Sequence, residues 1–163
     1  MLYPLSYGGL AGADGSSGAL WADTVAIVAR TAVPRGPAVA IRILAVDDDA
    51  TIRKLLQVNL ELEGFEVHLA NDGQDGLDKV RELRPDLVLL DIMMPHLTGW
   101  EVCEAMQADE ELARIPVVFL SARASDADIK RGEAMGAAYM TKPFDPFDLI
   151  DLVSDLTSDI ADA

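Results

Sequence analysis

The 163-residue chain has one cysteine, Cys103, and no apolar segment long enough to cross a membrane. A single cysteine excludes an internal disulfide, which suits a reducing compartment. A membrane-spanning helix needs about 18 mostly apolar residues, and the longest candidates here are interrupted by Asp23 and Arg42. The amino terminus also lacks the basic and apolar regions of a secretion signal. These absences predict a cytoplasmic protein that does not insert into membranes.

Basic residues are also scarce in this chain. It has 13 lysines and arginines against 28 aspartates and glutamates, for a formal net charge of −15. A surface that binds nucleic acid needs a basic patch to contact phosphates. The composition therefore predicts no nucleic-acid partner, and it leaves open that some of the acidic residues form a cation site.

The composition changes near residue 40. Residues 1–40 are rich in Gly, Ala, Ser and Pro and contain few charged residues, a composition typical of linkers and disordered segments. We therefore expect a disordered N-terminal extension over 1–40, a domain over 41–160 and a tail at 161–163. Two alternatives stay open for the extension: a short helix over residues 19–30, or sequence that is not native to the protein.

Strand and helix patterns alternate through residues 41–160. Apolar runs typical of buried strands alternate with segments that have apolar residues at helical spacing. The expected strands cover 41–46, 65–70, 86–91, 115–121 and 137–141, and the expected helices cover 50–64, 73–83, 98–109, 126–136 and 145–160. Such alternation predicts an α/β fold with a five-stranded parallel sheet covered by helices on both faces. Right-handed crossovers make this sheet doubly wound.

Polar side chains stand where these expected strands end. Asp47 and Asp48 follow the first strand, Asp91 ends the third, Ser121 ends the fourth, and Lys142 follows the fifth. In doubly wound sheets, binding sites form beyond the carboxyl ends of the strands. We therefore expect these five side chains to share one edge of the sheet.

The chemistry of this set points to phosphate. Carboxylates without histidine or cysteine partners favour a hard cation such as Mg²⁺. A divalent ion, a lysine and a hydroxyl together match the needs of a phosphoryl group with its charged oxygens. Aspartate is itself a phosphoryl acceptor in some enzymes.

Four segments in this order resemble the receiver domain of two-component response regulators, and are similar to the stand-alone chemotaxis type. They are "ILAVDDDATIRKLL" (43–56), "LVLLDIMMPHLTGWE" (87–101), "VVFLSAR" (117–123) and "GAAYMTKPF" (136–144). The resemblance covers about residues 41–160. It implies a flavodoxin-like (βα)5 fold with strand order 2-1-3-4-5.

The resemblance also implies roles for individual residues. Asp91 would be the phosphoacceptor, served by a histidine kinase or a phosphotransfer protein, with Lys142 and Ser121 assisting the chemistry. Mg²⁺ would be bound by Asp47, Asp48, Asp91 and the backbone carbonyl of Met93. Ser121 and Tyr139 would form the switch, and the peptide bond between Lys142 and Pro143 would be cis.

The implied function is a phosphorylation-dependent signalling switch. Such a protein catalyses only its own phosphorylation and dephosphorylation, so it is not an enzyme in the usual sense. Because the chain ends soon after the fifth expected helix, we expect no effector domain and an output through contact with an unidentified target protein. The expected assembly is a monomer or a weak homodimer.

Two other functions remain to be weighed. The stretch "DDDAT" (47–51) also fits the motif of haloacid-dehalogenase-type phosphatases, in which Asp47 would be the nucleophile. That family needs a further acidic pair at a strand end, whereas the acids after Lys142 fall on an expected helix. A receiver that binds partners without being phosphorylated is the second alternative. For Tyr139, simple packing on an edge strand competes with the switch role.

Overall fold

A parallel sheet forms the centre of the structure, a computed structural model that describes residues 40–123 and 125–161. Within these residues, the strands are β1 (Arg42–Val46), β2 (Glu66–Ala70), β3 (Leu87–Asp91), β4 (Val117–Ser121) and β5 (Ala138–Thr141). All neighbouring strands are parallel, and their order is β2-β1-β3-β4-β5. The predicted fold class and strand order are confirmed. The predicted N-terminal extension lies, except for residue 40, outside the described residues.

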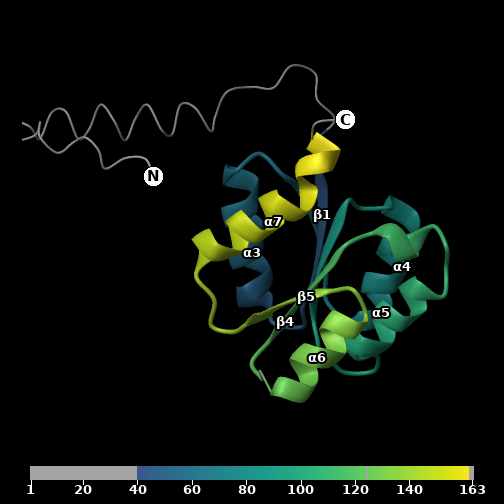
Figure 1. Cartoon of the computed structure of the whole chain (residues 1–163). Coiled ribbons are helices and arrows are strands. Elements are labelled where there is room, and N and C mark those ends of the chain that lie inside the picture. Colours follow the sequence, from purple (N-terminus) through teal and green to yellow (C-terminus); the bar gives the residue numbers. More distant parts are fainter. Residues whose placement is uncertain (1–39, 124, 162–163) are drawn as a thin grey trace, which may run out of the picture. The chain divides into compact units, whose positions relative to one another are not determined.

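Helices cover both faces of the sheet (Figure 1). In the described part of the chain they are α3 (Ala50–Leu62), α4 (Gly73–Leu83), α5 (Gly99–Gln107), α6 (Asp126–Ala134) and α7 (Pro146–Ala161). A short 3-10 helix, Leu112–Arg114, was not expected from the sequence. None of the helices in the described ranges is long and apolar enough to span a membrane.

Each central strand contributes side chains to two separate cores. Along β1, Ile43 and Ala45 pack with α3 and α7, whereas Leu44 and Val46 pack with α4 and α5. Successive side chains of a strand point to opposite faces, so a sheet covered on both sides needs apolar residues at every position. The continuous apolar runs of β1, β3 and β4 follow from this requirement, and they hold the strand ends rigidly in place.

Side-chain caps set the start of two helices, α3 and α5, that begin near the carboxyl ends of β1 and β3. Asp49 begins α3 by accepting hydrogen bonds from the backbone N–H groups of Thr51 and Ile52. Thr98 begins α5 through a capping box with Glu101, in which each side chain accepts from the other residue's backbone N–H. Such caps satisfy donors that the helix itself leaves free. They start these helices immediately after the loops that carry the acidic residues.

Gly99 lies unusually close to the end of β3. A Cβ atom at this position would lie 2.3 Å from the backbone oxygen of Asp91 and 2.9 Å from the Cα of Ile92. Both neighbours are backbone atoms that cannot rotate away. Glycine therefore allows α5 to begin directly against the strand end that carries Asp91.

We predict that Gly99→Ala destabilises the protein by about 3 kcal/mol or more, because the added methyl group forces the two backbone segments apart. Gly64→Ala is the matched control. Gly64 has a φ of +91° and open space around it, so its replacement should cost about 1–2 kcal/mol from the backbone conformation alone. Urea unfolding of both variants measures the difference. A cost at Gly99 no larger than that at Gly64 would contradict the close packing.

Candidate functional site

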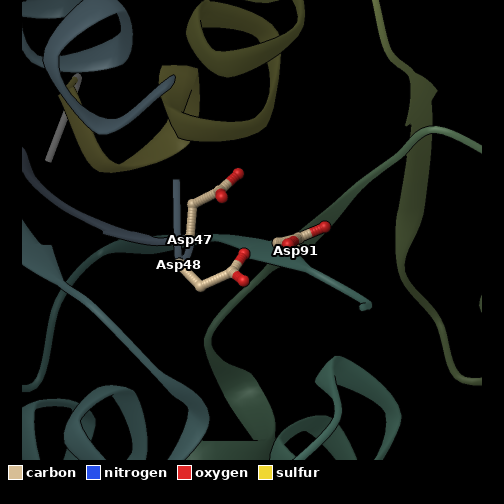
Figure 2. A group of neighbouring side chains, drawn as sticks. All are labelled: Asp47, Asp48 and Asp91. Carbon is tan, nitrogen blue, oxygen red and sulfur yellow. The ribbon is translucent and has the colours of Figure 1, made fainter. Parts of the chain in front are cut away.

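Three carboxylates meet at the carboxyl ends of the two central strands β1 and β3. Asp47 and Asp48 follow β1, and Asp91 is the last residue of β3 (Figure 2). Each offers an oxygen atom, and these atoms all lie within 4.8 Å of one another. Asp47 and Asp91 are buried, with exposed fractions of 1% and 5%, whereas Asp48 is exposed. The cluster therefore has a buried floor and one carboxylate open to solvent.

Lys142 connects the two buried carboxylates. Its Nζ atom lies 2.6 Å from Oδ2 of Asp47 and 3.4 Å from Oδ1 of Asp91. The preceding strand, β5, is at the sheet edge, and the backbone N–H of Lys142 donates to the Ser121 carbonyl at the end of β4. The Lys142–Pro143 peptide bond is cis, as predicted. One ammonium group thus offsets part of the negative charge of the cluster.

Asp47 is held by further contacts. Its Oδ1 accepts the backbone N–H of Asp49 at 2.8 Å, and its backbone carbonyl accepts a hydrogen bond from Arg53 at 2.6 Å. Arg53 was missed in the sequence analysis. It lies in α3, six residues beyond Asp47, where its spacing gives no sign that the side chain reaches back to the loop. The Asp49 N–H and the Lys142 ammonium together engage both oxygens of the Asp47 carboxylate.

The environment changes the protonation of two groups in the cluster. Burial and the nearby charge of Asp47 raise the pKa of Asp91 from 3.8 to about 6, although Lys142 acts in the opposite direction. Burial lowers the pKa of Lys142, but the hydrogen bond and charge of Asp47, with a contribution from Asp91, outweigh it and raise that pKa. Lys142 therefore stays charged, whereas burial and the neighbouring negative charge both favour the protonated form of Asp91.

The donor set fits a hard divalent cation. Three carboxylate oxygens converge without histidine or cysteine, as Mg²⁺ prefers. Mg²⁺ usually keeps several water ligands, and the exposed side of the cluster at Asp48 gives water access. Asp47, Asp48 and Asp91 would hold such an ion. Met93, two residues beyond Asp91, has an exposed side chain. The role of its backbone carbonyl as a metal ligand stays a prediction.

Ser121 lies at the same edge of the sheet but makes a local contact. It is buried at the end of β4, next to β3, where Asp91 pairs with Leu120. Its Oγ accepts the backbone N–H of Arg123 at 3.1 Å. The hydroxyl proton is not used in that contact, so Ser121 keeps a donor.

Tyr139 is set back from the carboxylates, in the middle of β5. Its half-buried ring lies 6.4 Å from the ring of Phe119, measured between centroids. Its hydroxyl donates to the backbone carbonyl of Arg123. Ser121 and Tyr139 therefore contact the same residue, Arg123, in the loop before α6. This shared contact was not visible in the sequence, because it depends on how one loop crosses the sheet edge.

Comparison with known proteins identifies the family. The family model for the response regulator receiver domain matches residues 43–154. The chain belongs to the receiver domain family. Receiver domains act in two-component signalling, so the predicted resemblance is confirmed. Family membership also favours a signalling role over the phosphatase alternative.

The receiver resembles both curated proteins and solved structures. It is 44% identical over 110 residues to the DNA-binding response regulator MtrA of Mycobacterium tuberculosis, covering 67% of this chain and 47% of that protein. It is 42% identical over 106 residues to the alkaline phosphatase synthesis regulatory protein PhoP of Bacillus subtilis, covering 64% and 43%. The Vibrio cholerae chemotaxis protein CheY4 superposes with a TM-score of 0.68 at 31% identity, over 72% of this chain and 99% of that one.

The prediction that nucleic acid is not a partner is wrong. MtrA and the Synechocystis regulator RpaA are named as DNA-binding proteins, and the chain spans about half the length of such relatives. The prediction relied on the net charge of this chain, which describes the surface of the receiver. Charge on one unit carries no information about a DNA-binding unit elsewhere. For the same reason, the expectation of an output through protein contact alone is withdrawn.

We predict that Asp91→Asn stabilises the metal-free receiver at pH 7 by up to about 3 kcal/mol, because it removes a buried charge whose pKa is raised. A raised carboxyl pKa means that the folded state binds a proton more tightly. The loss of folding stability that ionised Asp91 causes in the wild-type protein is therefore absent below the ordinary pKa of 3.8. It is complete above about pH 6. Denaturant unfolding at several pH values should show the difference opening across this window.

The control for Asp91→Asn is Asp48→Asn, which removes the same charge from an exposed position and should change the stability less. A variant Asp91→Asn that is less stable than wild type at pH 7 would mean that the ion pair with Lys142 outweighs burial and repulsion.

We further predict that Mg²⁺ stabilises the wild-type receiver in thermal unfolding. Binding to the folded state alone adds about 1.4 kcal/mol to the free energy of unfolding when Mg²⁺ is present at ten times its Kd. The Asp91→Asn variant should gain much less stability from Mg²⁺. The effect should weaken at pH 5, where a proton competes for Asp91. Melting curves in EDTA and in Mg²⁺ test this, and an equal shift in wild type and variant would place the ion outside the carboxylate cluster.

Proposed function

We propose that the protein is a phosphorylation switch in which Asp91 accepts a phosphoryl group from a histidine kinase or a phosphotransfer protein. The observation that carries this proposal is the position of Asp91: a buried carboxylate within reach of Lys142 and beside the Asp47–Asp48 pair. Lys142 supplies a positive charge for the phosphoryl oxygens, and the Asp47–Asp48 pair would help to bind Mg²⁺. Membership of the receiver family supports the assignment.

The residues suggest how the transfer proceeds. A carboxylate oxygen of Asp91 forms the new bond to phosphorus as the bond from phosphorus to the donor breaks, and the donor leaves with that electron pair. Lys142, fixed by Asp47, places its positive charge beside the incoming phosphoryl oxygens, and Ser121 can donate its hydroxyl proton to one of them. Mg²⁺, held by Asp47, Asp48, Asp91 and the Met93 carbonyl, would neutralise charge on the same group.

The surroundings of the two buried aspartates favour Asp91 over Asp47 as the nucleophile. Both oxygens of Asp47 are engaged, one by Lys142 and the other by the backbone N–H of Asp49. Asp91 has a single contact with Lys142, at the longer distance of 3.4 Å. With a pKa of about 6, it is mostly ionised at pH 7 and therefore nucleophilic. The geometry thus argues against the phosphatase alternative.

The switch would act through the loop before α6. A phosphoryl group on Asp91 adds about −1.5 to −2 charges at this edge, and it offers Ser121 stronger acceptors than any now in reach. Movement of Ser121 toward them would break its contact with Arg123, to which Tyr139 is also bonded. We therefore assign Ser121 and Tyr139 as the residues that carry the change to the surface.

We place the output of this switch in the control of transcription. The named relatives are DNA-binding and transcriptional regulators, and the receiver surface is acidic, so another unit would contact DNA. The receiver itself would catalyse only its own phosphorylation and dephosphorylation. A single, buried cysteine suits a cytoplasmic location, where two-component phosphotransfer would take place.

We predict that acetyl phosphate and Mg²⁺ phosphorylate the wild-type receiver at Asp91 alone, as measured by mass spectrometry of the intact protein and its peptides. Asp91→Asn should take up no phosphate. The matched variant Asp47→Asn should still be labelled at Asp91, although much more slowly, because it loses a metal ligand and the partner of Lys142. Label on Asp47, or label that persists in Asp91→Asn, would contradict the proposed function.

A further inference from the structure

Little apolar burial holds helix α6 to the protein. Of its nine residues, Gly132 is the only one that is buried, whereas α4, α5 and α7 each bury at least three residues. Since buried apolar area supplies most of the attachment of a helix, α6 depends more than its neighbours on individual polar contacts.

Arg131 supplies the main polar contacts of α6, and both go to α5. One guanidinium nitrogen lies 2.9 Å from a carboxylate oxygen of Glu104. The guanidinium carbon lies 4.4 Å from the centre of the Trp100 ring, within the range of a cation–π interaction. Gln107, also in α5, donates to the Met135 carbonyl at the end of α6. One arginine therefore joins the two helices by charge and by ring contact at once.

The ring under Arg131 is connected to the site through two further aromatic residues. Trp100 packs on Phe119 with a centroid distance of 4.6 Å, and Phe119 faces Tyr139 at 6.4 Å. Gly132 rests on the same rings: a Cβ there would lie 3.4 Å from Tyr139 and 3.5 Å from Phe119. Helix α6 thus lies across this aromatic row, with Arg131 at the Trp100 end and the hydroxyl of Tyr139 under the loop that leads into it.

We propose that Arg131 is a latch that holds α6 against α5 in the unphosphorylated receiver and opposes the switch. The inference rests on the proposed function, in which Ser121 and Tyr139 move when Asp91 is phosphorylated. A change at Tyr139 shifts the surface on which Gly132 rests. For α6 to follow, Arg131 must leave Glu104 and Trp100, and Gln107 must release the Met135 carbonyl. The latch then sets how far the equilibrium favours the inactive conformation before any phosphate arrives.

Linkage makes this proposal measurable. If the latch exists only in the inactive conformation, its removal raises the population of the active one, and any ligand that prefers the active conformation binds more tightly. The beryllofluoride anion with Mg²⁺ mimics a phosphoryl group on a carboxylate and is such a ligand. We expect Arg131→Gln to bind it about three- to tenfold more tightly than wild type, given the usual strength of exposed ion pairs and cation–π contacts.

Two variants separate the latch from general effects of losing an arginine. Glu104→Gln removes the ion pair and keeps the ring contact, so its affinity should rise by a smaller factor. Arg84→Gln is the matched control, because Arg84 pairs with Glu111 and is as exposed as Arg131, at 50% and 49%, but does not touch α6. Its affinity for beryllofluoride should equal that of wild type.

Trp100 provides an independent readout of the latch. The chain has two tryptophans, Trp21 and Trp100, so Trp21→Phe leaves Trp100 as the sole emitter. Adding Mg²⁺ and beryllofluoride should change its fluorescence as Arg131 leaves the ring, and the change should be much smaller in a background that also carries Arg131→Gln.

The outcomes distinguish the latch from the proposed function. If wild type does not bind beryllofluoride, or if Asp91→Asn binds it equally well, the proposed function fails. If wild type binds it and Arg131→Gln binds with the same or weaker affinity, the function stands and the latch is wrong. In that case Arg131 supports the fold equally in both states, and only the thermal stability of the variant should fall.

Discussion

Electrostatic repulsion among three carboxylates is the constraint on which this receiver depends. Two of them, Asp47 and Asp91, are withdrawn from water at the ends of strands that have apolar neighbours on both faces. Lys142 offsets the repulsion only in part, because it contacts Asp47 more closely than Asp91. Burial and, after it, the charge of Asp47 raise the pKa of Asp91 to about 6. A divalent cation bound by these carboxylates would relieve their repulsion, whereas a phosphoryl group would add further negative charge at the same place.

The sequence predicted much of the fold because the pattern and the architecture have one cause. A strand covered on both faces must be apolar throughout, so β1, β3 and β4 are recognisable as short apolar runs, and the acids that end them are conspicuous. Asp47, Asp48 and Asp91 lie together for that reason. Lys142 joins them from the end of the edge strand β5. Arg53 and Arg131 were not foreseen, since their contacts depend on the path that each long side chain takes. That of Arg53 runs back to the loop before its own helix, and that of Arg131 runs across to α5. The short helix at Leu112–Arg114 escaped notice because three residues carry no periodicity.

The error about nucleic acid has an instructive physical origin. Net charge describes the average field of one folded unit, and the acidic surface of this receiver is real. In a signalling protein with several domains, however, the domain that receives the signal and the domain that produces the output bind different partners and need different surface charges.

The start of α5 against β3 has a consequence for how this protein can vary. The backbone N–H of Gly99 donates to the carbonyl of Ile92 at 2.9 Å, and the glycine itself abuts the carbonyl of Asp91. The segment between them is therefore a closed loop, tied at its base, and Met93 lies within it. An inserted residue would have to bulge out of this loop, because both of its ends are fixed. Length changes should therefore be excluded from residues 93–98.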